Sequence, residues 1–494
     1  MKISDLLTDA AIPSDAATLM PQALTAKAER ITPSTLFFLT EGVSYDTERL
    51  LPYILARKPL AIVINESADF PETEIPLLRV QSVRHAYAEA YFRFCGLEKA
   101  KLKYIAVTGT NGKTTTAMML REILTQSGHA VGWIGTGKIL CKNEPLSAPF
   151  YSMTTPDPEV LYPALAKMEA EGCEFVVMEA SSHALALEKL APIRFDLSLF
   201  TNLSAEHLDF HKTMERYYLA KAKLFFQSEI GIFNNDDPFA RRLAAEAPCR
   251  VLLAGAVYPA GVALKNIEQN EFDGYSYMFK TDTVAFFVDL KLRGVYHVYN
   301  SMLAIYAAIT LGIAPRDAKH AIESITAIPG RMQRIGNEDI SVFIDYAHTP
   351  EALQSALREA RATKRADQAL WLIFGCGGER DREKRPKMAE IAEKLADHVI
   401  LTLDNCRGES PIQILKDTAA GFRNRKSARI ISNREKAIRH AILSMKSGDI
   451  LIIAGKGHEA YNIDKRGYHP FDETKIALDA LKERNRGYTV LYEN

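Results

Sequence analysis

Residues 104–116 read YIAVTGTNGKTTT, and this stretch decides the fold of the chain. Its first four residues, Tyr104–Val107, have strand character and lead into a loop that contains Gly109 and Gly112. After the loop, apolar residues recur at the spacing of a helix. A strand, a glycine loop and a helix in this order place backbone N–H groups and a helix N-terminus around phosphate groups. The sequence therefore predicts that the chain binds a nucleoside triphosphate.

The end of this loop carries the residues for phosphate chemistry. Lys113 would reach the β- and γ-phosphates, and the Thr114 hydroxyl would hold Mg²⁺. The strict P-loop pattern has glycine where this chain has Val107. The match is therefore incomplete, and a Gly/Thr turn that opens an ordinary helix is the alternative. The strand and helix expected on either side of Gly-Lys-Thr favour the phosphate site.

Length and composition indicate a cytoplasmic protein of several domains. The chain has 494 residues, of which 47% are hydrophobic and 25% charged, and this is typical of a globular protein with about three domains. Its 61 basic and 61 acidic residues give no net charge, so we expect no nucleic-acid partner. The first residues lack the pattern expected of a signal peptide, and no apolar run reaches about 18 residues, so no membrane is expected. Six cysteines without CxxC spacing fit a reducing compartment.

The chain divides into three units, expected at residues 1–98, 99–332 and 333–494. The first reads as a small α/β domain, and the charged segment 96–103 is a plausible linker after it. Short β-rich runs alternate with helical stretches in the second unit, which predicts βαβ units and a mainly parallel sheet. The expected strands of the first two units are Thr35–Leu39, Leu60–Ile64, Tyr104–Val107, Phe175–Met178, Leu197–Phe200 and Gly231–Phe233.

In the third unit, a polar or glycine-bearing segment follows each expected strand. The strands are Val342–Ile344, Leu370–Phe374, His398–Leu401 and Ile450–Ile453, and the segments after them read DYAHTP, GCGGERD, DNCRGESP and AGKGHE. Ligands bind open parallel sheets beyond the carboxyl ends of the strands. The sequence thus predicts a second binding surface on a Rossmann-like domain.

The segment Met214–Phe225 predicts a helix with a lysine on its inward face. Its apolar residues share one face and Lys221 lies in the middle of that face, whereas Lys223 points elsewhere. A buried lysine is costly unless it extends to solvent, forms an ion pair or loses its proton. A neutral amine can react with CO₂ to give a carbamate, a carboxylate-like metal ligand. From spacing alone, extension to solvent or an ion pair remains the alternative.

Two histidines and a carboxylate are candidate metal ligands. His207 and His211 are four residues apart, which would place both on one helix face as in a zinc pair, but the glutamate of HExxH is missing. Glu179 follows the strand Phe175–Met178. A carboxylate at a strand end and a P-loop threonine are the usual ligands of nucleotide-bound Mg²⁺. We therefore expect Glu179 and Thr114 to serve magnesium.

The third unit offers side chains for a zwitterion. In DNCRGESP, Arg407 could bind a carboxylate and Asp404 an amine. Gly377 and Gly378 suggest that the backbone approaches a ligand closely. His348, in DYAHTP, would by itself more often be a surface histidine.

Taken together, these motifs resemble the Mur ligases, ATP-dependent enzymes that add amino acids to the peptidoglycan precursor. GTNGKTT, TTPD, ExSSH, TNLSxxHLDFH, Gly330-Arg331, DYAHTP, FGCGGxRDxxKRP, DNxR and GKGHE occur in the order of that family over nearly the whole chain. The resemblance implies an α/β protein of three domains that bind UDP, ATP and the incoming amino acid. The implied substrates are ATP, UDP-N-acetylmuramoyl-L-alanyl-D-glutamate and a diamino acid, with Mg²⁺ as cofactor.

The resemblance also implies roles for individual residues. ATP would be bound by Thr110, Asn111, Gly112, Lys113, Thr114, Thr115, Asn300, Arg331, Asp345 and His348. Magnesium and catalysis would depend on Thr114, Glu179, His207 and Lys221, the last matching the family's carbamylated lysine, with Lys113 on the phosphates. The muramoyl-dipeptide would contact Ser44, Thr154, Thr155, Ser181 and Lys189. The amino-acid pocket would consist of Arg380, Asp404, Asn405, Arg407, Gly455 and Glu459.

Several positions depart from the family pattern. Cys406 replaces the proline of Asp-Asn-Pro-Arg, which removes a fixed φ from that loop. Arg407 remains, and it would bind the distal carboxylate of meso-diaminopimelate, which L-lysine lacks; we therefore favour diaminopimelate, with lysine as the alternative. Lys189 stands at a usual Arg position and His297 at a usual Asn. The family's Asp-Ser-Arg triplet near the uridine site is not found in Thr25–Arg30.

Two other functions remain open at this point. One is a nucleotide-binding regulatory protein that has lost ligation, which would need no cluster of Lys113, Glu179, His207 and Lys221. The other is a ligase such as folylpolyglutamate synthase, which shares the P-loop but is disfavoured by DNxR, GKGHE and the N-terminal domain. For the oligomeric state, we expect a monomer.

Overall fold

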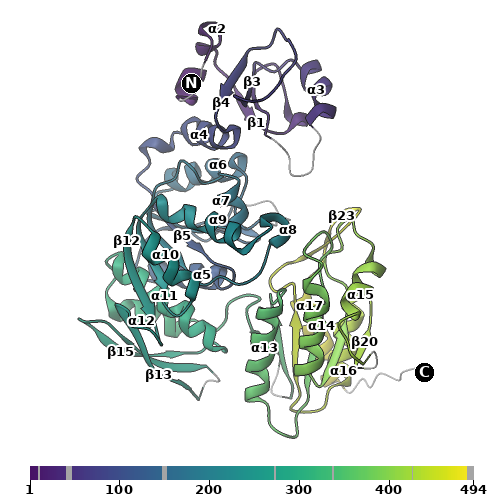
Figure 1. Cartoon of the computed structure of the whole chain (residues 1–494). Helices are drawn as coiled ribbons and strands as arrows, with labels where there is room; N and C mark the ends of the chain where they lie inside the picture. The colour runs from purple at the N-terminus through teal and green to yellow at the C-terminus, as the bar shows by residue number, and fades with distance from the viewer. Residues whose placement is uncertain are drawn as a thin grey trace.

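The structure is a computed structural model that describes residues 1–8, 10, 12–40, 47–146, 153–271, 274–336, 339–424 and 427–486. Its strands form sheets that follow one another along the chain (Figure 1). The first sheet belongs to the N-terminal unit, the central sheet contains the P-loop strand, and the third sheet belongs to the C-terminal unit. The prediction of an α/β protein with mainly parallel sheets is confirmed.

The first sheet is parallel and is joined to the central unit by one helix. Its strands are β1 (Ala23–Thr25), β2 (Thr35–Phe38), β3 (Ala61–Asn65) and β4 (Leu77–Val80), and the helices of this part are α1 (Ile3–Leu6), α2 (Ser14–Ala17), α3 (Thr47–Ala56) and α4 (Val83–Phe94). Helix α4 begins after Ser82, whose hydroxyl accepts a hydrogen bond from the His85 amide. Its Tyr87 ring packs against Phe38 of the first sheet, and its Phe92 ring packs against Tyr162 of the central unit.

The central sheet has the order β15-β14-β13-β12-β11-β10-β5-β9-β6-β7-β8. Its strands are β5 (Lys103–Thr108), β6 (Val131–Gly135), β7 (Lys138–Cys141), β8 (Glu144–Pro145), β9 (Phe175–Glu179), β10 (Phe195–Phe200), β11 (Ser228–Asn234), β12 (Arg250–Gly255), β13 (Val262–Gln269), β14 (Tyr275–Lys280) and β15 (Ala285–Leu290). From β13 to β6 the neighbouring strands are parallel, and antiparallel strands extend both edges. The P-loop strand β5 therefore lies inside the sheet, between β10 and β9.

Helices cover both faces of the central sheet because side chains alternate along each strand. Ile105 and Val107 of β5 pack with α5, α11 and α12, whereas Tyr104 and Ala106 pack with α6, α9 and α10. The helices of this unit are α5 (Lys113–Gln126), α6 (Pro158–Ala170), α7 (Ser182–Ala186), α8 (Leu208–His211), α9 (Met214–Phe226), α10 (Pro238–Glu246), α11 (Val295–Thr310) and α12 (Pro315–Ser324). Helix α8 lies on the side of the central unit that faces the third sheet (Figure 1).

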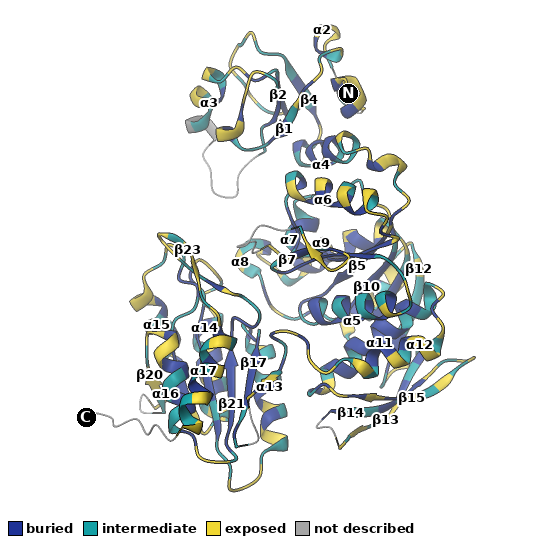
Figure 2. Cartoon of the chain, turned by 180° about the vertical axis from the view of Figure 1, so that it is seen from behind, coloured by how far each residue is buried: buried dark blue, intermediate teal, exposed yellow. Residues whose placement is uncertain are grey.

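The third sheet has the order β16-β17-β21-β18-β19-β20, and only the pairing of β16 with β17 is antiparallel among these described strands. Its strands are β16 (Gln333–Ile335), β17 (Ser341–Asp345), β18 (Leu370–Phe374), β19 (His398–Leu401), β20 (Ala428–Ile430) and β21 (Ile450–Ala454), and β22 (Tyr461–Asp464) pairs with β23 (Gly467–Pro470). One face is covered by α13 (Pro350–Thr363), α14 (Lys384–Leu395) and α15 (Pro411–Ala419), and the other by α16 (Arg434–Ser444) and α17 (Glu473–Asn485). Figure 2 shows buried strands between helices with exposed outer faces.

The expected strands all occur. Leu370–Phe374 and His398–Leu401 agree with the structure to the residue, and the others differ by one to three residues at their ends. The helix expected at Met214–Phe225 is α9, and the expected linker contains a short 3₁₀ turn, Leu97–Lys99, before β5.

No helix in the described part of the chain is long and apolar enough to cross a membrane.

A buried ion pair holds α16 and α17 on the third sheet, and its loss tests the packing there. Arg434 donates from Nε to Glu473 and from Nη2 to the carbonyl of Ala454, at 2.8 Å, and both charged side chains are almost fully buried. Replacement Glu473→Gln leaves the Arg434 charge without its partner, so we expect a loss of about 3–5 kcal/mol in the free energy of unfolding.

The measurement is urea unfolding followed by Trp371 fluorescence in a Trp133→Phe background, because these are the only two tryptophans of the chain. The matched control is Glu483→Gln, which removes a partly exposed pair with Arg439 between the same two helices and should cost about 0–1 kcal/mol. An equal loss of unfolding free energy in both variants would contradict the stabilising role given to the buried pair of Arg434 and Glu473.

Candidate functional site

The P-loop lies between β5 and α5 and depends on two glycines. Gly109 and Gly112 have φ of 145° and 87°, and a Cβ on Gly109 would lie 1.9 Å from Thr201 Oγ1. Lys113 Nζ donates to the carbonyls of Gly109 and Thr110, at 3.0 and 2.9 Å. The loop is thus closed on itself, with the Lys113 ammonium at its centre.

The Glu179 carboxylate, at the end of β9, is fully buried beside this loop. It accepts hydrogen bonds from Thr114 Oγ1 at 2.9 Å, from the Thr136 amide at 2.9 Å and from Thr136 Oγ1 at 3.2 Å. Arg331, from the segment before the third sheet, donates to the same Thr114 hydroxyl at 3.1 Å. Thr114 and Glu179, predicted from separate motifs, therefore lie in direct contact.

Lys221 is on the inward face of α9, as its spacing predicts. Its side chain is buried, Nζ donates to the Gly109 carbonyl at 2.7 Å, and the same nitrogen lies 4.8 Å from the centre of the Tyr217 ring. Among the described residues it has no carboxylate within ion-pair distance, and Lys223 is exposed. Burial, together with the charge of Lys113, holds the pKa of Lys221 well below its usual range. Extension to solvent and ion pairing, the alternatives left open by spacing, do not occur.

The helix expected to carry both His207 and His211 begins only after His207, although both rings pack against His183 and Tyr217. Helix α8 begins at Leu208, and His207 precedes it with a left-handed φ of 57°. His211 Nε2 contacts Ser182 Oγ at 2.9 Å, while the His207 ring packs edge-on against His183. Helix α8 has only four residues, so a residue four positions before its last one falls outside the helix. Burial lowers the pKa of His207 to about 3, so its ring is neutral near pH 7.

Glu206 is a site residue that sequence reasoning missed. Its side chain is nearly buried, and Oε1 lies 3.0 Å from Nε2 of His348, at the start of the third unit. His348 Nδ1 donates to the carbonyl of Tyr346 at 2.8 Å, so both ring nitrogens face oxygen acceptors. No motif signals Glu206, because its partner is 142 residues away.

A cavity of about 370 Å³ opens between the P-loop, α11 and α13. Among the predicted nucleotide residues, its lining includes Asn111, Gly112, Thr115, Asn300, Arg331, Asp345 and His348. Tyr346, which was not predicted, also lines it and lies under the Arg331 guanidinium at 4.5 Å from the ring centre. His297 lines it as well, and burial lowers its pKa to about 3. The cavity combines aromatic faces with polar groups, as a purine nucleotide requires.

The predicted muramoyl-dipeptide residues lie on the other side of Glu179. Thr155 Oγ1 donates to the Glu179 carbonyl at 2.8 Å and lies 3.2 Å from Ser181 Oγ, and Thr154 contacts Thr136. Lys189 forms an ion pair with Asp157 at 2.6 Å and lines a cleft of about 160 Å³ between the first and central units. Ser44 lies outside the described residues.

Several of the residues predicted to bind the amino-acid substrate lie around Lys456, a buried lysine that the sequence analysis did not single out. Lys456 Nζ lies 2.9 Å from Asn405 Oδ1, 3.2 Å from Asp404 and 3.9 Å from Glu459, and Asn405 Nδ2 donates to Glu459 at 2.8 Å. Gly455 has φ of 117°, and a Cβ there would lie 2.9 Å from Asp404 Oδ2. Lys456 is part of the GKGHE motif, so the signal was present in the sequence.

Arg380 and Arg407 come from different loops and meet beside Gly377. A Cβ on Gly377 would lie 3.0 Å from Arg407 Nη1 and 3.8 Å from Arg380 Cγ. Arg407 Nη1 donates to the carbonyls of Gly378 and Asn405, at 2.9 and 3.3 Å. Burial and the neighbouring Arg407 lower the pKa of Arg380. Two arginine side chains that converge on one glycine favour an anionic ligand.

The donor set around Glu179 fits magnesium. A buried carboxylate and the Thr114 hydroxyl are oxygen ligands of the kind that Mg²⁺ prefers when phosphate oxygens complete its shell. Among the described side chains there is no group of three or more His, Cys, Asp and Glu that could hold a metal by itself. A magnesium ion here would therefore be held jointly by protein and nucleotide.

Known proteins match the chain along most of its length. The Mur ligase middle domain matches residues 107–308, and the domain described as "Mur ligase, glutamate ligase domain" matches residues 330–457. A UDP-N-acetylmuramoyl-L-alanyl-D-glutamate–2,6-diaminopimelate ligase of Chlorobaculum tepidum is 39% identical over 93% of this chain and 92% of its own, and one of Bacillus cereus is 34% identical over 94% of each chain.

Solved structures agree with these matches. One of a UDP-N-acetylmuramoyl-L-alanyl-D-glutamate–2,6-diaminopimelate ligase is 29% identical, with a TM-score of 0.68 over 98% of this chain and 99% of the other. The structure of FolC from E. coli, with 17% identity and a TM-score of 0.60 over 75% of this chain and 89% of the other, shows a shared fold alone.

Gly112 offers a direct test of the nucleotide cavity. A Cβ at this position would lie 2.5 Å from Asn300 Oδ1, so Gly112→Ala should displace Asn300 and deform the P-loop. We expect the Kd for ADP to rise about tenfold or more, measured by isothermal titration calorimetry. The control is Gly128→Ala after the other end of α5, which has a similar φ of 91° but no atom within 4 Å of the added Cβ. Weaker binding in both variants would point to general backbone strain instead.

Proposed function

Because the chain belongs to the Mur ligase family, we propose that it is the ATP-dependent ligase that joins meso-diaminopimelate to UDP-N-acetylmuramoyl-L-alanyl-D-glutamate in peptidoglycan precursor synthesis. The observation that carries this proposal is the similarity over more than nine-tenths of the chain to relatives of that name, which spans both the P-loop cluster and the Arg407 loop. The chain is thus an amide-bond-forming enzyme with small-molecule substrates.

The reaction has two steps, phosphoryl transfer and amide formation. The γ-carboxylate of the D-Glu residue attacks the γ-phosphorus of ATP. The bond from this phosphorus to the bridging oxygen breaks, ADP leaves, and the carboxylate becomes an acyl phosphate. The amine of the incoming amino acid then attacks the acyl carbon, and phosphate leaves as the amine loses a proton. Lys113 and the P-loop amides would hold the transferred phosphoryl group, and catalysis rests mainly on positioning and charge neutralisation. Magnesium would neutralise phosphate charge near Thr114 and Glu179.

Arg407 supports diaminopimelate as the amino acid. Its guanidinium is oriented by the carbonyls of Gly378 and Asn405 and would pair with a distal carboxylate. L-lysine has an ammonium at that end, which two neighbouring arginines would repel. The acidic side chains Asp404 and Glu459 would bind the ammonium groups.

We also propose that Lys221 carries a carbamate. A neutral amine attacks CO₂ to form a carbamate and release a proton, and the lowered pKa of the buried Lys221 favours the neutral amine. The carbamate would add a carboxylate-like ligand for magnesium beside Lys113, which would balance its charge. His207, neutral by burial, is the further ligand proposed in this cluster.

The proposal extends to the organisation of the protein. Domains at residues 1–98, 99–332 and 333–494 would bind the UDP substrate, ATP and the amino acid, and their expected boundaries fall between the three sheets. We propose a monomer in the cytoplasm, where these substrates occur.

The first test is phosphate release from ATP with Mg²⁺ and UDP-N-acetylmuramoyl-L-Ala-D-Glu, comparing meso-diaminopimelate with L-lysine. We expect turnover with diaminopimelate and at least about 100-fold lower kcat/KM with lysine, because an unpaired buried charge costs several kcal/mol. Efficient use of lysine would overturn the role given to Arg407. Nucleotide binding without turnover for either amino acid would instead favour a regulatory protein that has lost ligation.

The role of Lys221 is tested by Lys221→Ala, which should lower kcat by at least about 100-fold because a ligand of the phosphoryl-transfer site is lost. Lys221→Glu supplies a carboxylate and should retain more activity than the alanine variant. Lys223→Ala, on the exposed face of the same helix, is the control and should behave as the wild type. Full activity of Lys221→Ala would remove this residue from the mechanism.

A further inference from the structure

The two loops that carry Arg380 and Arg407 are both strained. Glu379 and Arg407 have left-handed φ of 52° and 51°, a conformation that side chains other than glycine adopt rarely. Such a conformation persists only where the surroundings hold the residue in place. Something in the structure must therefore fix both loops.

The loops are bonded to each other directly. The Gly378 amide donates to the carbonyl of Asn405 at 2.9 Å, the Glu379 amide donates to Glu409 Oε2 at 3.0 Å, and the Gly408 amide donates to Glu379 Oε1 at 3.2 Å. A Cβ on Gly378 would lie 2.0 Å from the carbonyl oxygen of Cys406, so the two backbones are in contact. The Glu379 and Glu409 side chains thus cross-link the two loops in both directions.

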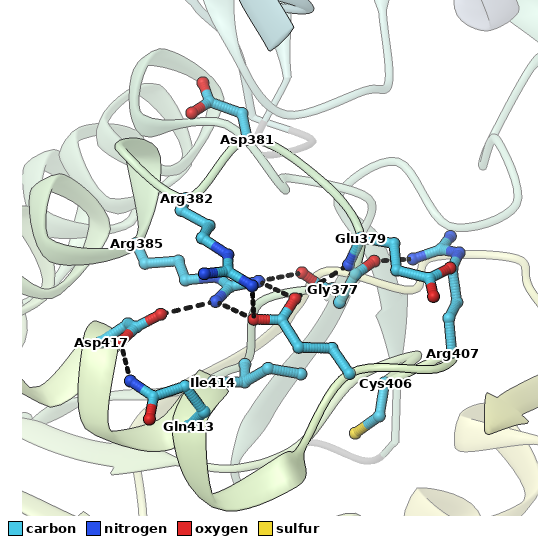
Figure 3. A network of polar contacts seen from close by, with 12 residues as sticks. Gly377, Glu379, Asp381, Arg382, Arg385, Cys406, Arg407, Gln413, Ile414 and Asp417 are labelled. Carbon is cyan, nitrogen blue, oxygen red and sulfur yellow. Dashed lines mark hydrogen bonds and ion pairs between the residues drawn. The ribbon is translucent and has the colours of Figure 1, made fainter. Parts of the chain in front are cut away.

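One guanidinium, that of Arg385 near the start of α14, underlies this junction (Figure 3). Its side chain is completely buried. Nη1 and Nη2 donate to the two oxygens of Glu409, at 2.8 and 2.7 Å, in a bidentate pair. Nη1 also donates to Asp417 of α15 at 2.7 Å, and Nη2 to the Gly377 carbonyl at 3.2 Å. Arg385 therefore joins α14, α15 and both loops.

We propose that Arg385 is a positioning residue for the amino-acid substrate, which sets the spacing of Arg380 and Arg407 through Gly377 and Glu409. This inference rests on the proposed function. Cys406 leaves the second loop without the fixed φ of a proline, and the bidentate pair supplies the rigidity from below. Arg385 itself does not touch the proposed ligand; it acts through the loops that do.

The test is Arg385→Lys, which keeps the charge but cannot bond to both oxygens of Glu409, to Asp417 and to Gly377 in one plane. The KM for diaminopimelate should rise about tenfold or more, while the KM for ATP and for the UDP-dipeptide stays within about twofold. The matched control is Arg382→Lys, since Arg382 bonds to the same carboxylate at 3.0 Å through a side chain that is 67% exposed. This control should keep all three KM values.

Amide hydrogen exchange provides a second readout that needs no turnover. In Arg385→Lys, the amides of Glu379 and Gly408 should exchange faster than in the wild type, with the strands of the third sheet unchanged. Unchanged exchange and an unchanged KM would overturn the proposal, as would an equal rise of all three KM values. A wild-type enzyme inactive with diaminopimelate would refute the proposed function alone, because the exchange experiment still decides the role of Arg385. If Arg385→Lys does not fold, Glu409→Gln gives the same comparison from the other partner.

Discussion

The rest of the site depends on the hydrogen bonds that surround the buried carboxylate of Glu179. Removing an ion from water costs several kcal/mol, so such a charge is tolerated only where donors surround it. Here the donors are the hydroxyl of Thr114 and the amide and hydroxyl of Thr136. The first residue belongs to α5 and the second follows β6. One charge thus fixes the P-loop helix relative to the end of the neighbouring strand.

The segment before the third sheet and the third unit itself contact the same two threonines. Arg331 donates to Thr114 Oγ1 at 3.1 Å, and His458 donates from Nε2 to the Thr136 carbonyl at 2.8 Å. His458 belongs to the GKGHE motif, whose Lys456 and Glu459 lie among the residues of the proposed amino-acid pocket. A rotation of the third unit would therefore break the contact of His458 beside the proposed nucleotide site and move the proposed amino-acid pocket at the same time. The GKGHE motif therefore links the proposed nucleotide site to the proposed amino-acid pocket, because His458 contacts the first and Lys456 and Glu459 belong to the second.

Sequence reasoning captured the local features of this protein and missed those that depend on distant partners. Short apolar runs predicted the strands, and the glycine spacing predicted the P-loop. The inward position of Lys221 followed from helical periodicity alone. Glu206 gave no such signal, because its partner His348 lies 142 residues away. Arg385 belongs to the motif FGCGGxRDxxKRP, but no local pattern indicates that it pairs with Glu409 and Asp417. The helix predicted from the spacing of His207 and His211 excludes His207, because this residue itself has a left-handed φ.

The distribution of charge in the proposed amino-acid pocket offers a reason why a loop without the family's proline could still select its amino acid. Lys456 lies among Asp404, Asn405 and Glu459, so that end retains net negative charge and suits an ammonium group. At the other end, Arg380 and Arg407 form no ion pair with a carboxylate among the described residues. A ligand with a carboxylate there relieves the repulsion of two guanidinium groups, whereas a ligand with an ammonium adds a third positive charge. Selectivity would then come as much from repulsion of the wrong amino acid as from attraction of the right one. Both effects would require that the two arginines stay where the strained loops hold them.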